Sequence, residues 1–395
     1  MRRRVFIGAN KTVKKLIIIA TVPIVFETWL KGQAKYLSQF YDVEIITSFS
    51  PTIAAIESYE NVPVRCVALN RKINLLLDIK VLIHLWHYFR QSKPSIVYTV
   101  TPKAGLLGML ASWLCRVPLR IHNIVGLPMM EARGIRKLIL EITERITYLC
   151  ATHLYANSFN LKAYIQKYLT HKAVNVIAQG SINGVDVNFF HNSLSPLERD
   201  SLKKALGFEE GDFVITFVGR IVKDKGIIEL VHAFDTLSQS FEHLKLLLVG
   251  HFEELLDPID AESKAIIEHN QKITHLGFKE DIRTYLAITD LFVLPSYREG
   301  LPNVLIEAGS YGIPLLATNI NGCNEVILPE KNGLLVEPKD VDALCVSIKR
   351  FIVEKDFYHE VKKNVRQSIL NRYAQDSFWL ALRDEFSKLE KEVKV

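Results

Sequence analysis

Short apolar runs alternate with longer amphipathic stretches along most of the chain. In the first half, the runs favour strands at Leu16–Val22, Val43–Thr47, Val64–Ala68, Ile96–Thr99, Arg120–Asn123, His153–Ala156 and Val174–Ile177. Helical patterns lie between them, at Trp29–Phe40, Leu75–Arg90, Gly105–Cys115, Arg136–Cys150 and Leu161–Tyr168. Because the runs are almost wholly apolar rather than alternating, they are typical of parallel strands covered on both faces.

The same order of elements restarts after a polar stretch at residues 191–212, where a helix begins near Pro196. Further strands are predicted at Phe213–Val218, Leu244–Val249, Lys272–Leu276, Leu291–Leu294 and Leu315–Ala317. The chain of 395 residues therefore predicts an α/β protein with two doubly wound, Rossmann-like domains facing across a cleft. We place these domains at residues 1–190 and 191–376, and we expect a last helix at 377–395 to cross back to the first domain.

Charge is distributed unevenly between the two halves. Residues 1–190 hold 24 basic against 10 acidic side chains, a net charge of +14, whereas residues 191–395 hold 25 against 33, a net charge of −8. A basic first half indicates an anionic partner, which could be nucleic acid, an anionic membrane surface or a phosphorylated substrate. Charge alone does not choose among them.

The chain has no apolar run of the roughly 18 residues that a membrane-spanning helix needs. Its basic start resembles a signal peptide, but the apolar part is short and is followed by Pro23 and Glu27. We therefore expect a basic tail that leads into a buried first strand. The five cysteines are scattered and form no CxxC pair, so we expect reduced thiols and no zinc site.

Two cations follow the first strand of the second half, within the segment VGRIVKDKG at residues 218–226. Arg220 comes directly after Gly219, and Lys225 stands just before the next helix. Point charges beside the unpaired N–H groups of a helix start make an anion site, so this segment favours phosphate binding. A solvated loop with incidental charges is the alternative.

Another strand end carries the segment EGLPNVLIE at residues 299–307. Here a helix opens near Pro302, with Glu299 in the loop and Glu307 about two turns along. Ionised carboxylates are strong acceptors for sugar or ribose hydroxyls. Each glutamate taken alone could equally be a capping or surface residue.

Together, these segments resemble glycosyltransferase family 4, of the branch that builds bacterial capsule, O-antigen and lipid-linked oligosaccharides. The matching stretches in the second half are 218–226, LLLVG at 246–250, HLGF at 275–278, 299–307, GIPLLAT at 312–318 and NGLLVEP at 332–338; those in the first half are TPKAGLLGMLA at 101–111, RIHNIVGLP at 120–128 and GSINGVDVNFF at 180–190. The resemblance covers nearly the whole chain and implies a GT-B fold with retaining chemistry. One departure is the loop after the first strand, where many members have a Gly-Gly pair and this chain has Gly32 alone.

The resemblance also implies roles for individual residues. Arg220 and Lys225 would neutralise the departing diphosphate, Glu299 would hold the transferred sugar, and His122 would reach that sugar or its phosphate from the first domain. Donor-binding residues would be Glu307 at the ribose, with Gly219, Gly300, Leu301, Asn303, Gly250, Gly277 and Phe278 around the phosphates, sugar and base. The diphosphate itself would take the acceptor's proton, so no protein nucleophile is required.

On this basis we expect a hexosyl- or N-acetylhexosaminyltransferase that uses a nucleotide-diphosphate sugar, with uridine favoured over guanosine, and no metal or other cofactor. The one DxD match, Asp340 to Asp342, begins a helix and is typical of an N-cap. We interpret Asp186 as a residue that holds its loop by hydrogen bonds from nearby backbone N–H groups to its carboxylate. The expected acceptor is a polyprenyl-diphosphate-linked lipid or a saccharide.

A membrane-surface location on the cytoplasmic side is expected because the net charge of +14 lies in the half that does not bind the donor, and from two further features of that half. The helix at 71–93 is rich in apolar residues, and the apolar tip Leu127–Met130 is followed by the basic residues Arg133, Arg136 and Lys137.

Two alternative functions stay open. A GT-B-type nucleotide-sugar epimerase would need paired carboxylates in the first domain, which the sequence does not show, and a nucleic-acid-binding protein would need a reading motif, which is also not evident.

Overall fold

The computed structural model describes residues 13–70, 74–130, 132–254 and 257–393. The predicted basic tail at residues 1–12 lies outside these ranges. The chain divides into two compact units: the first comprises the chain up to Asn157, Lys162–Ile177 and the segment from Trp379 on, and the second comprises Ser158–Leu161 and Ala178–Phe378. Each unit is an α/β domain, as the alternating pattern predicts.

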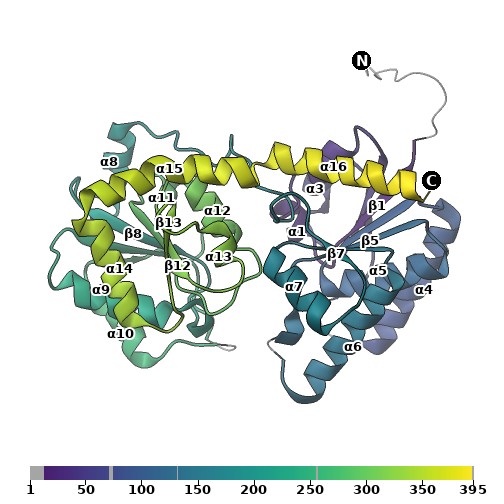
Figure 1. The fold of residues 1–395 in the computed structure, drawn as a ribbon, viewed down its shortest axis with the longest axis horizontal. Coiled ribbons are helices and arrows are strands. Elements are labelled where there is room, and N and C mark those ends of the chain that lie inside the picture. Colours follow the sequence, from purple (N-terminus) through teal and green to yellow (C-terminus); the bar gives the residue numbers. More distant parts are fainter. Residues whose placement is uncertain (1–12, 71–73, 131, 255–256, 394–395) are drawn as a thin grey trace. The chain divides into compact units, whose positions relative to one another are not determined.

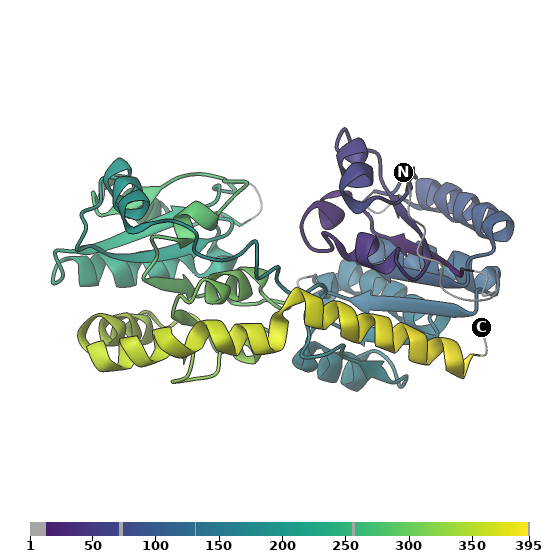
Figure 2. The ribbon, with the colours of Figure 1, turned by 90° about the horizontal axis from the view of Figure 1, so that it is seen from above.

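The first unit contains a parallel sheet of seven strands in the order β3-β2-β1-β4-β5-β6-β7 (Figure 1). Its strands are β1 (Lys15–Ile19), β2 (Asp42–Thr47), β3 (Val64–Cys66), β4 (Ile96–Val100), β5 (Leu119–Ile124), β6 (His153–Ala156) and β7 (Val174–Asn175). The helices that accompany it are α1 (Ile24–Glu27), α2 (Gln33–Leu37), α3 (Ile53–Glu60), α4 (Leu75–Ser92), α5 (Pro102–Leu114), η1 (Pro128–Met130), α6 (Gly134–Cys150), α7 (Phe159–Tyr168) and α16 (Gln375–Glu392). Helices cover both faces of the sheet, which explains why the central strands are apolar throughout (Figure 2).

From Trp379 on, the long helix α16 packs with the first unit. Its Phe386 is fully buried, and the centroid of its ring lies 5.6 Å from that of Tyr98 and 6.3 Å from that of Tyr41.

The structure assigns residues 178–190, which the sequence pattern placed with the first domain, to the second unit. The reason is packing, because Val185 belongs to the second hydrophobic core and its N–H donates to the carbonyl of Tyr373 at 2.7 Å.

The loop after β1 is organised around a buried glutamate. Gly32 has a φ of 83° and stands directly before α2. Its N–H donates to Oε1 of Glu60 at 2.6 Å, and the N–H of Lys35 donates to Oε2 of the same carboxyl at 3.0 Å. A side chain from α3 thus fixes this loop.

The second unit contains a parallel sheet of six strands in the order β10-β9-β8-β11-β12-β13. Its strands are β8 (Phe213–Val218), β9 (Leu244–Val249), β10 (Ile273–His275), β11 (Leu291–Leu294), β12 (Leu315–Thr318) and β13 (Gly333–Val336). Its helices are α8 (Pro196–Ala205), η2 (Lys223–Lys225), α9 (Ile227–Ser238), α10 (Ala261–His269), α11 (Arg283–Leu286), α12 (Asn303–Ser310), α13 (Cys323–Val326), α14 (Val341–Val353) and α15 (Lys355–Tyr373). The pattern analysis missed β13, which is a short edge strand that starts with a glycine.

In each sheet, the strand order reverses between two neighbouring strands. These are β1 and β4 in the first unit and β8 and β11 in the second. Loops that leave the carboxyl ends of such a pair diverge, so a crevice for ligands forms there. Gly219 follows β8, and Pro295 follows β11. The fold therefore brings the segments 218–226 and 299–307, which carry the predicted cations and glutamates, to the same crevice.

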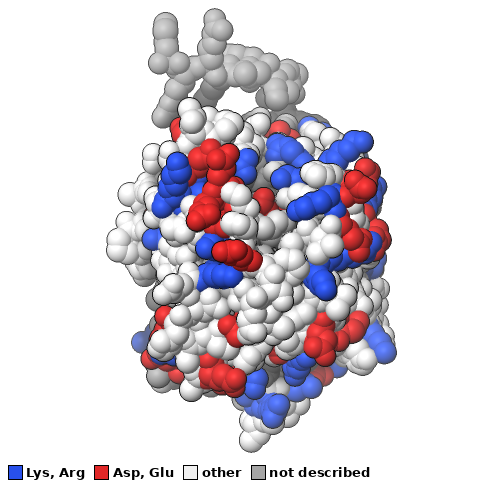
Figure 3. Space-filling model, turned by 90° about the vertical axis from the view of Figure 1, so that its left-hand side faces the viewer, with Lys and Arg blue, Asp and Glu red and all other residues white. Residues whose placement is uncertain are grey.

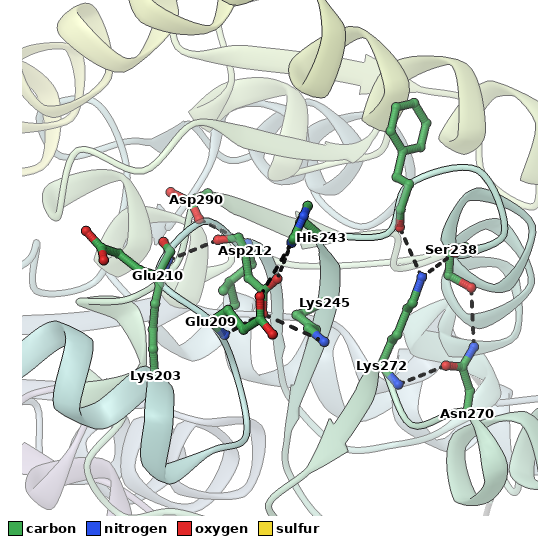
Figure 4. Close-up of polar contacts among 12 residues, drawn as sticks. Lys203, Glu209, Glu210, Asp212, Ser238, His243, Lys245, Asn270, Lys272 and Asp290 are labelled. Atoms are coloured by element: carbon green, nitrogen blue, oxygen red, sulfur yellow. Dashed lines mark hydrogen bonds and ion pairs between the residues drawn. The ribbon is translucent and has the colours of Figure 1, made fainter.

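The amino edge of the second sheet, at the opposite ends of these strands, is held by a polar network (Figure 4). Asp212 precedes β8, and His243 precedes β9; the Nδ1 of His243 lies 3.4 Å from Oδ1 of Asp212 and 3.9 Å from a carboxylate oxygen of Glu209. Lys245 lies 3.7 Å from the other Asp212 oxygen. This is the one group of three His, Cys, Asp or Glu side chains with metal-ligand spacing in the described part of the chain. Its position at the strand starts, with a lysine among its partners, indicates a role in fastening the strands.

Several smaller predictions can be compared with the structure directly. All five cysteines are free thiols, as expected. Asp340 caps α14 by accepting from the N–H of Ala343 at 2.8 Å, which confirms that the DxD match is an N-cap. Asp186 accepts from the backbone N–H groups of Asn188 and Phe189, as predicted. Within the described ranges, no helix is both long and apolar enough to cross a bilayer.

Candidate active site

Two strand ends in the second unit approach each other so closely that only glycine fits between them. Gly250 follows β9 with a φ of 150°, and a Cβ atom built on it would lie 1.7 Å from the carbonyl oxygen of Gly219, which follows β8. The N–H of Ile221 donates to the carbonyl of His251 at 2.9 Å, which continues the pairing beyond the strands. This close contact fixes the backbone that carries Arg220.

A second close approach joins the loop after β8 to the end of β11. Gly226 has a φ of 69°, and a Cβ atom on it would stand 2.0 Å from the carbonyl oxygen of Pro295. The N–H of Tyr297 also donates to the carbonyl of Asp224 at 2.9 Å. As a result, the Nζ of Lys225 lies 2.5 Å from Oε1 of Glu299, across 74 residues of sequence.

The two cations of this loop each have a carboxylate partner. Arg220 forms an ion pair with Glu253, and Lys225 forms one with Glu299. Asp224 lies among them: burial raises the pKa of its carboxyl, Asp257 adds to the rise, and Lys225 and Arg220 act against it. The cluster therefore contains alternating charges whose cations can turn to a stronger anion such as a diphosphate.

The segment between β11 and α12 presents backbone groups to this cluster. Pro302 precedes α12, and no side chain caps the first turn of that helix, which begins at Asn303. The side-chain amide of Asn321 donates to the carbonyls of Glu299 and Gly300, at 3.1 and 3.3 Å. The N–H of Leu305 donates to the carbonyl of Pro302, and those of Asn303 and Val304 are available to an anion. Since the Leu301 side chain is buried in the core, this predicted residue can contribute through its backbone.

Glu307 lies in the middle of α12, on a half-buried position. Burial raises the pKa of its carboxyl to about 7. No salt bridge joins it to a cation within the described residues. A carboxyl in this setting is available to accept hydrogen bonds from hydroxyl groups.

The residues predicted to hold the base lie at the neighbouring strand ends. The N–H of Gly250 donates to the carbonyl of Gly277 at 2.9 Å, and the Nε2 of His275 lies 2.7 Å from the carbonyl oxygen of Gly250. Phe278 is 70% exposed, and its ring centroid is 6.4 Å from that of His251. An exposed aromatic ring beside ordered backbone amides is a surface on which a planar base can stack.

His122 belongs to the first unit and lies in β5. It is 1% exposed, and its Nδ1 lies 2.8 Å from the Oγ1 of Thr99 in β4. Burial lowers the pKa of its imidazole to about 4, so the ring is neutral at physiological pH. A neutral imidazole suits a hydroxyl group better than a phosphate. Of the two partners that the sequence left open for His122, the sugar is therefore favoured over its phosphate.

Sequence reasoning missed three residues of this cluster. Glu253 forms an ion pair with Arg220. The carboxylate of Asp224 accepts two hydrogen bonds from the guanidinium of Arg298, at 2.9 and 2.5 Å. The hydroxyl of Tyr297 donates to Glu229 at 2.5 Å. A signal was present for Glu253, because it follows Gly250 by three residues and so had to lie near the end of β9. For Asp224 and Tyr297 the partners are far away in sequence, and the pattern gave no indication of them.

Comparison with known proteins places this arrangement in a class. Residues 198–368 match the family model described as "Glycosyl transferases group 1", and residues 30–177 match the "Glycosyl transferase 4-like domain". The capsular polysaccharide biosynthesis glycosyltransferase CapM of Staphylococcus aureus is 30% identical over 366 residues, which cover 92% of this chain and 94% of that protein. The chain therefore belongs to the glycosyltransferases with group 1 and 4-like domains, as the motifs predicted.

Two further proteins are similar to this chain. The UDP-Gal:alpha-D-GlcNAc-diphosphoundecaprenol alpha-1,3-galactosyltransferase of Escherichia coli is 30% identical over 317 residues, 79% of each chain. The crystal structure of Anabaena HepE in complex with UDP and glucose superposes with a TM-score of 0.78 at 21% identity, covering 95% of this chain and all of that chain. The structural likeness confirms the GT-B fold class.

Removing either cation should abolish most of the activity without unfolding the protein. Arg220→Ala and Lys225→Ala are each expected to lower kcat by on the order of 100-fold or more, because a preorganised cation is lost where charge develops. Steady-state kinetics measures the loss, and circular dichroism checks the fold. Arg350→Ala is the matched control, because that arginine pairs with Glu330 and Glu354 on the surface of α14. Near-normal kcat in both site variants would show that the site is elsewhere.

Proposed function

We propose that this chain is a retaining, metal-independent glycosyltransferase that moves a hexose or N-acetylhexosamine from a UDP-sugar to a lipid-linked or saccharide acceptor in bacterial surface polysaccharide synthesis. The observation that carries the proposal is the cluster of Arg220 and Lys225 beside the uncapped start of α12. Cations and unpaired N–H groups at one strand switch point suit the diphosphate of a nucleotide sugar. Of the relatives named above, one is named for the donor UDP-Gal and a diphosphoundecaprenol-linked acceptor and the other for capsular polysaccharide biosynthesis, which supports the choice of donor and pathway.

The resting contacts of the two cations support a leaving-group role for them. As the sugar departs, negative charge accumulates on the diphosphate, and Arg220 and Lys225 can exchange their carboxylate partners for it. Interactions that strengthen as charge develops accelerate the reaction. These cations supply the positive charge that a divalent metal would otherwise bring, which is why we propose a metal-independent reaction.

When a diphosphate takes over Lys225, the carboxylate of Glu299 loses its resting partner and can accept hydrogen bonds from sugar hydroxyls. We therefore assign it to hold the sugar, and we propose that the acceptor attacks on the face from which the diphosphate leaves. The diphosphate then accepts the acceptor's proton. This reaction retains the configuration at the anomeric carbon without a covalent enzyme intermediate.

The surface of the first unit supports a location at an anionic membrane. Helix α6 exposes an apolar stripe along its length, from Ile135 at 78% to Leu149 at 71% exposure. The stripe consists of Ile135, Leu138, Ile139, Ile142, Ile146 and Leu149. Arg136 and Lys137 flank it on the same helix. An amphipathic helix of this kind lies in the plane of a membrane interface.

Neighbouring helices of the first unit also expose apolar side chains. Helices α4 and α6 both pack against α5 in the same layer of the first unit (Figure 1). The exposed apolar side chains on α4 and at the end of α5 are Leu75, Leu76, Ile79, Ile83, Trp113 and Leu114. The structure changes one detail of the expectation: in the loop before α6, Leu127 and Met129 are buried, whereas Met130 is 56% exposed, so the loop adds one apolar side chain to those of the helices.

The second unit differs in its surface. Basic and acidic side chains are interleaved over the face shown in Figure 3. This mixture of charges makes the second unit the natural source of control substitutions for membrane binding.

A transfer assay with product analysis tests the proposed function as a whole. Incubation with UDP-glucose, UDP-galactose or UDP-N-acetylglucosamine, a polyprenyl-diphosphate saccharide and EDTA should yield a product in which proton NMR shows the α-anomeric linkage of the donor preserved. Inverted configuration would contradict the retaining mechanism, and loss of transfer with EDTA would contradict metal independence.

The two glutamates of α12 and its preceding loop should separate in their effects on nucleotide binding. Glu307→Ala is expected to weaken binding of UDP alone, because the ribose is already present in that ligand. Glu299→Ala should leave UDP binding unchanged or tighter, because its loss frees Lys225, but should impair sugar transfer. Isothermal titration calorimetry measures both effects, and equal weakening by the two substitutions would contradict the assignment.

Membrane attachment should depend on the basic residues beside α6. Liposome co-sedimentation is expected to show binding that requires anionic lipid and weakens with salt, since each basic residue near the surface adds ~1 kcal/mol. Neutralising Arg133, Arg136 and Lys137 together should reduce it strongly. The matched control neutralises the exposed Lys204, Lys331 and Lys349 of the second unit and should have little effect. Equal recovery in the supernatant with anionic and neutral liposomes at low salt would refute the location.

A further inference from the structure

Backbone contacts join the loops after β8 and β11 in the second unit. Gly226 meets the carbonyl of Pro295, and the N–H of Tyr297 donates to the carbonyl of Asp224 at 2.9 Å. Since residue 226 meets residue 295 and residue 224 meets residue 297, the two loops run past each other in opposite directions. Side chains of each loop therefore reach the other loop.

Ion pairs join these loops at consecutive positions. Lys225 pairs with Glu299, and Asp224 pairs with Arg298. In the proposed reaction the first pair opens, because the lysine turns to the diphosphate and the glutamate turns to the sugar. Neither member of the second pair has a part in that exchange, so this pair can stay closed while the first one opens.

The Asp224–Arg298 pair has the geometry of a fixed contact. Oδ1 of Asp224 accepts from Nε of Arg298 at 2.9 Å, and Oδ2 accepts from Nη2 at 2.5 Å. Two parallel hydrogen bonds of this kind fix the relative orientation of both planar groups. The N–H of Asp224 also donates to the carboxylate of Asp257 at 2.7 Å, which ties it to the segment after β9. The pair therefore holds Arg298, and with it the neighbouring Glu299, against the loop that carries Lys225.

We propose that Asp224 and Arg298 are positioning residues, whose ion pair keeps Glu299 aligned on the transferred sugar after Lys225 has turned to the diphosphate. The inference rests on the proposed function and adds two residues to it. It predicts that these residues act on sugar transfer and not on the affinity for the nucleotide.

The alternative role for Arg298 is that of a third cation for the diphosphate, since its side chain is 41% exposed. The surroundings of Asp224 favour the positioning role. Burial raises the pKa of its carboxyl, and the carboxylates of Asp257 and Glu299 add to the rise. Moving Arg298 to a ligand would leave these acids to repel one another.

Kinetics and nucleotide binding separate the two roles. Arg298→Ala and Asp224→Ala are each expected to lower kcat by about ten- to 100-fold, because a small displacement of a group that holds the substrate is costly. Calorimetric titration of Arg298→Ala with UDP should give an affinity within about twofold of wild type, since Arg220 and Lys225 are still present. UDP binding that weakens in Arg298→Ala as strongly as in Arg220→Ala would overturn the proposal.

A double-mutant cycle gives the second readout. Because the two residues act as a pair, the double variant Asp224→Ala, Arg298→Ala should have a kcat within about twofold of the worse single variant. Arg298→Lys, which keeps the charge but not the two parallel hydrogen bonds, should recover part of the loss. Losses that multiply in the double variant would overturn the proposal.

Arg350→Ala is the matched control, because that arginine makes a two-point contact with Glu330, and it should keep the wild-type kcat. Asp224→Asn and Arg298→Lys repeat the cycle with side chains of similar size, should an alanine variant fail to fold. Near-normal kcat in Arg220→Ala and Lys225→Ala would contradict the proposed site itself. If those variants lose activity and the Asp224 and Arg298 variants keep it, this inference alone is wrong.

Discussion

Close backbone contact at the carboxyl edge of the second sheet is the constraint on which the candidate site depends. Gly226 meets Pro295, Gly250 meets Gly219, and Gly322 comes within 2.0 Å of the Gly300 carbonyl when a Cβ atom is built on it. A side chain at any of these glycines would force adjacent loops apart. Since the cations and carboxylates of the site sit on those loops, their geometry follows from three positions that tolerate only hydrogen.

Charge compensation follows from this packing. With the loops packed together, the like charges of Arg220 and Lys225 would repel each other. Ion pairs with Glu253 and Glu299 compensate this repulsion. The Arg220–Glu253 pair is partly exposed and contributes little to stability, whereas the side chains of Lys225 and Glu299 are only 21% and 14% exposed, so that pair is given up only for a stronger anion. A diphosphate brings more negative charge than either carboxylate, which makes exchange favourable when a nucleotide sugar binds. The resting ion pairs are thus part of how the site can hold and then release a charged leaving group.

Much of this could be predicted from the sequence, because parallel strands buried on both faces leave continuous apolar runs. β6, β8, β9 and β11 begin and end where the runs do. The edge strand β13 was missed because it is short and half-buried. Arg220 and Lys225 were found because they follow a strand in sequence, whereas Asp224 and Tyr297 were not, since their partners Arg298 and Glu229 lie 74 and 68 residues away. The sequence showed no pair of carboxylates in the first domain; of the buried acids there, Glu44 is paired with Lys15 and Arg65, and Glu60 accepts from backbone N–H groups.

The central claim is that the cations of the second unit recognise a diphosphate, and a comparison of UDP with UMP tests it most directly. Calorimetric titration should show UDP binding at least tenfold more tightly than UMP in wild-type protein, a difference of about 1.4 kcal/mol. The difference should shrink in the double variant Arg220→Ala, Lys225→Ala and in high salt. Equal affinities for UDP and UMP in the wild type, or a difference that survives in the double variant, would contradict the account.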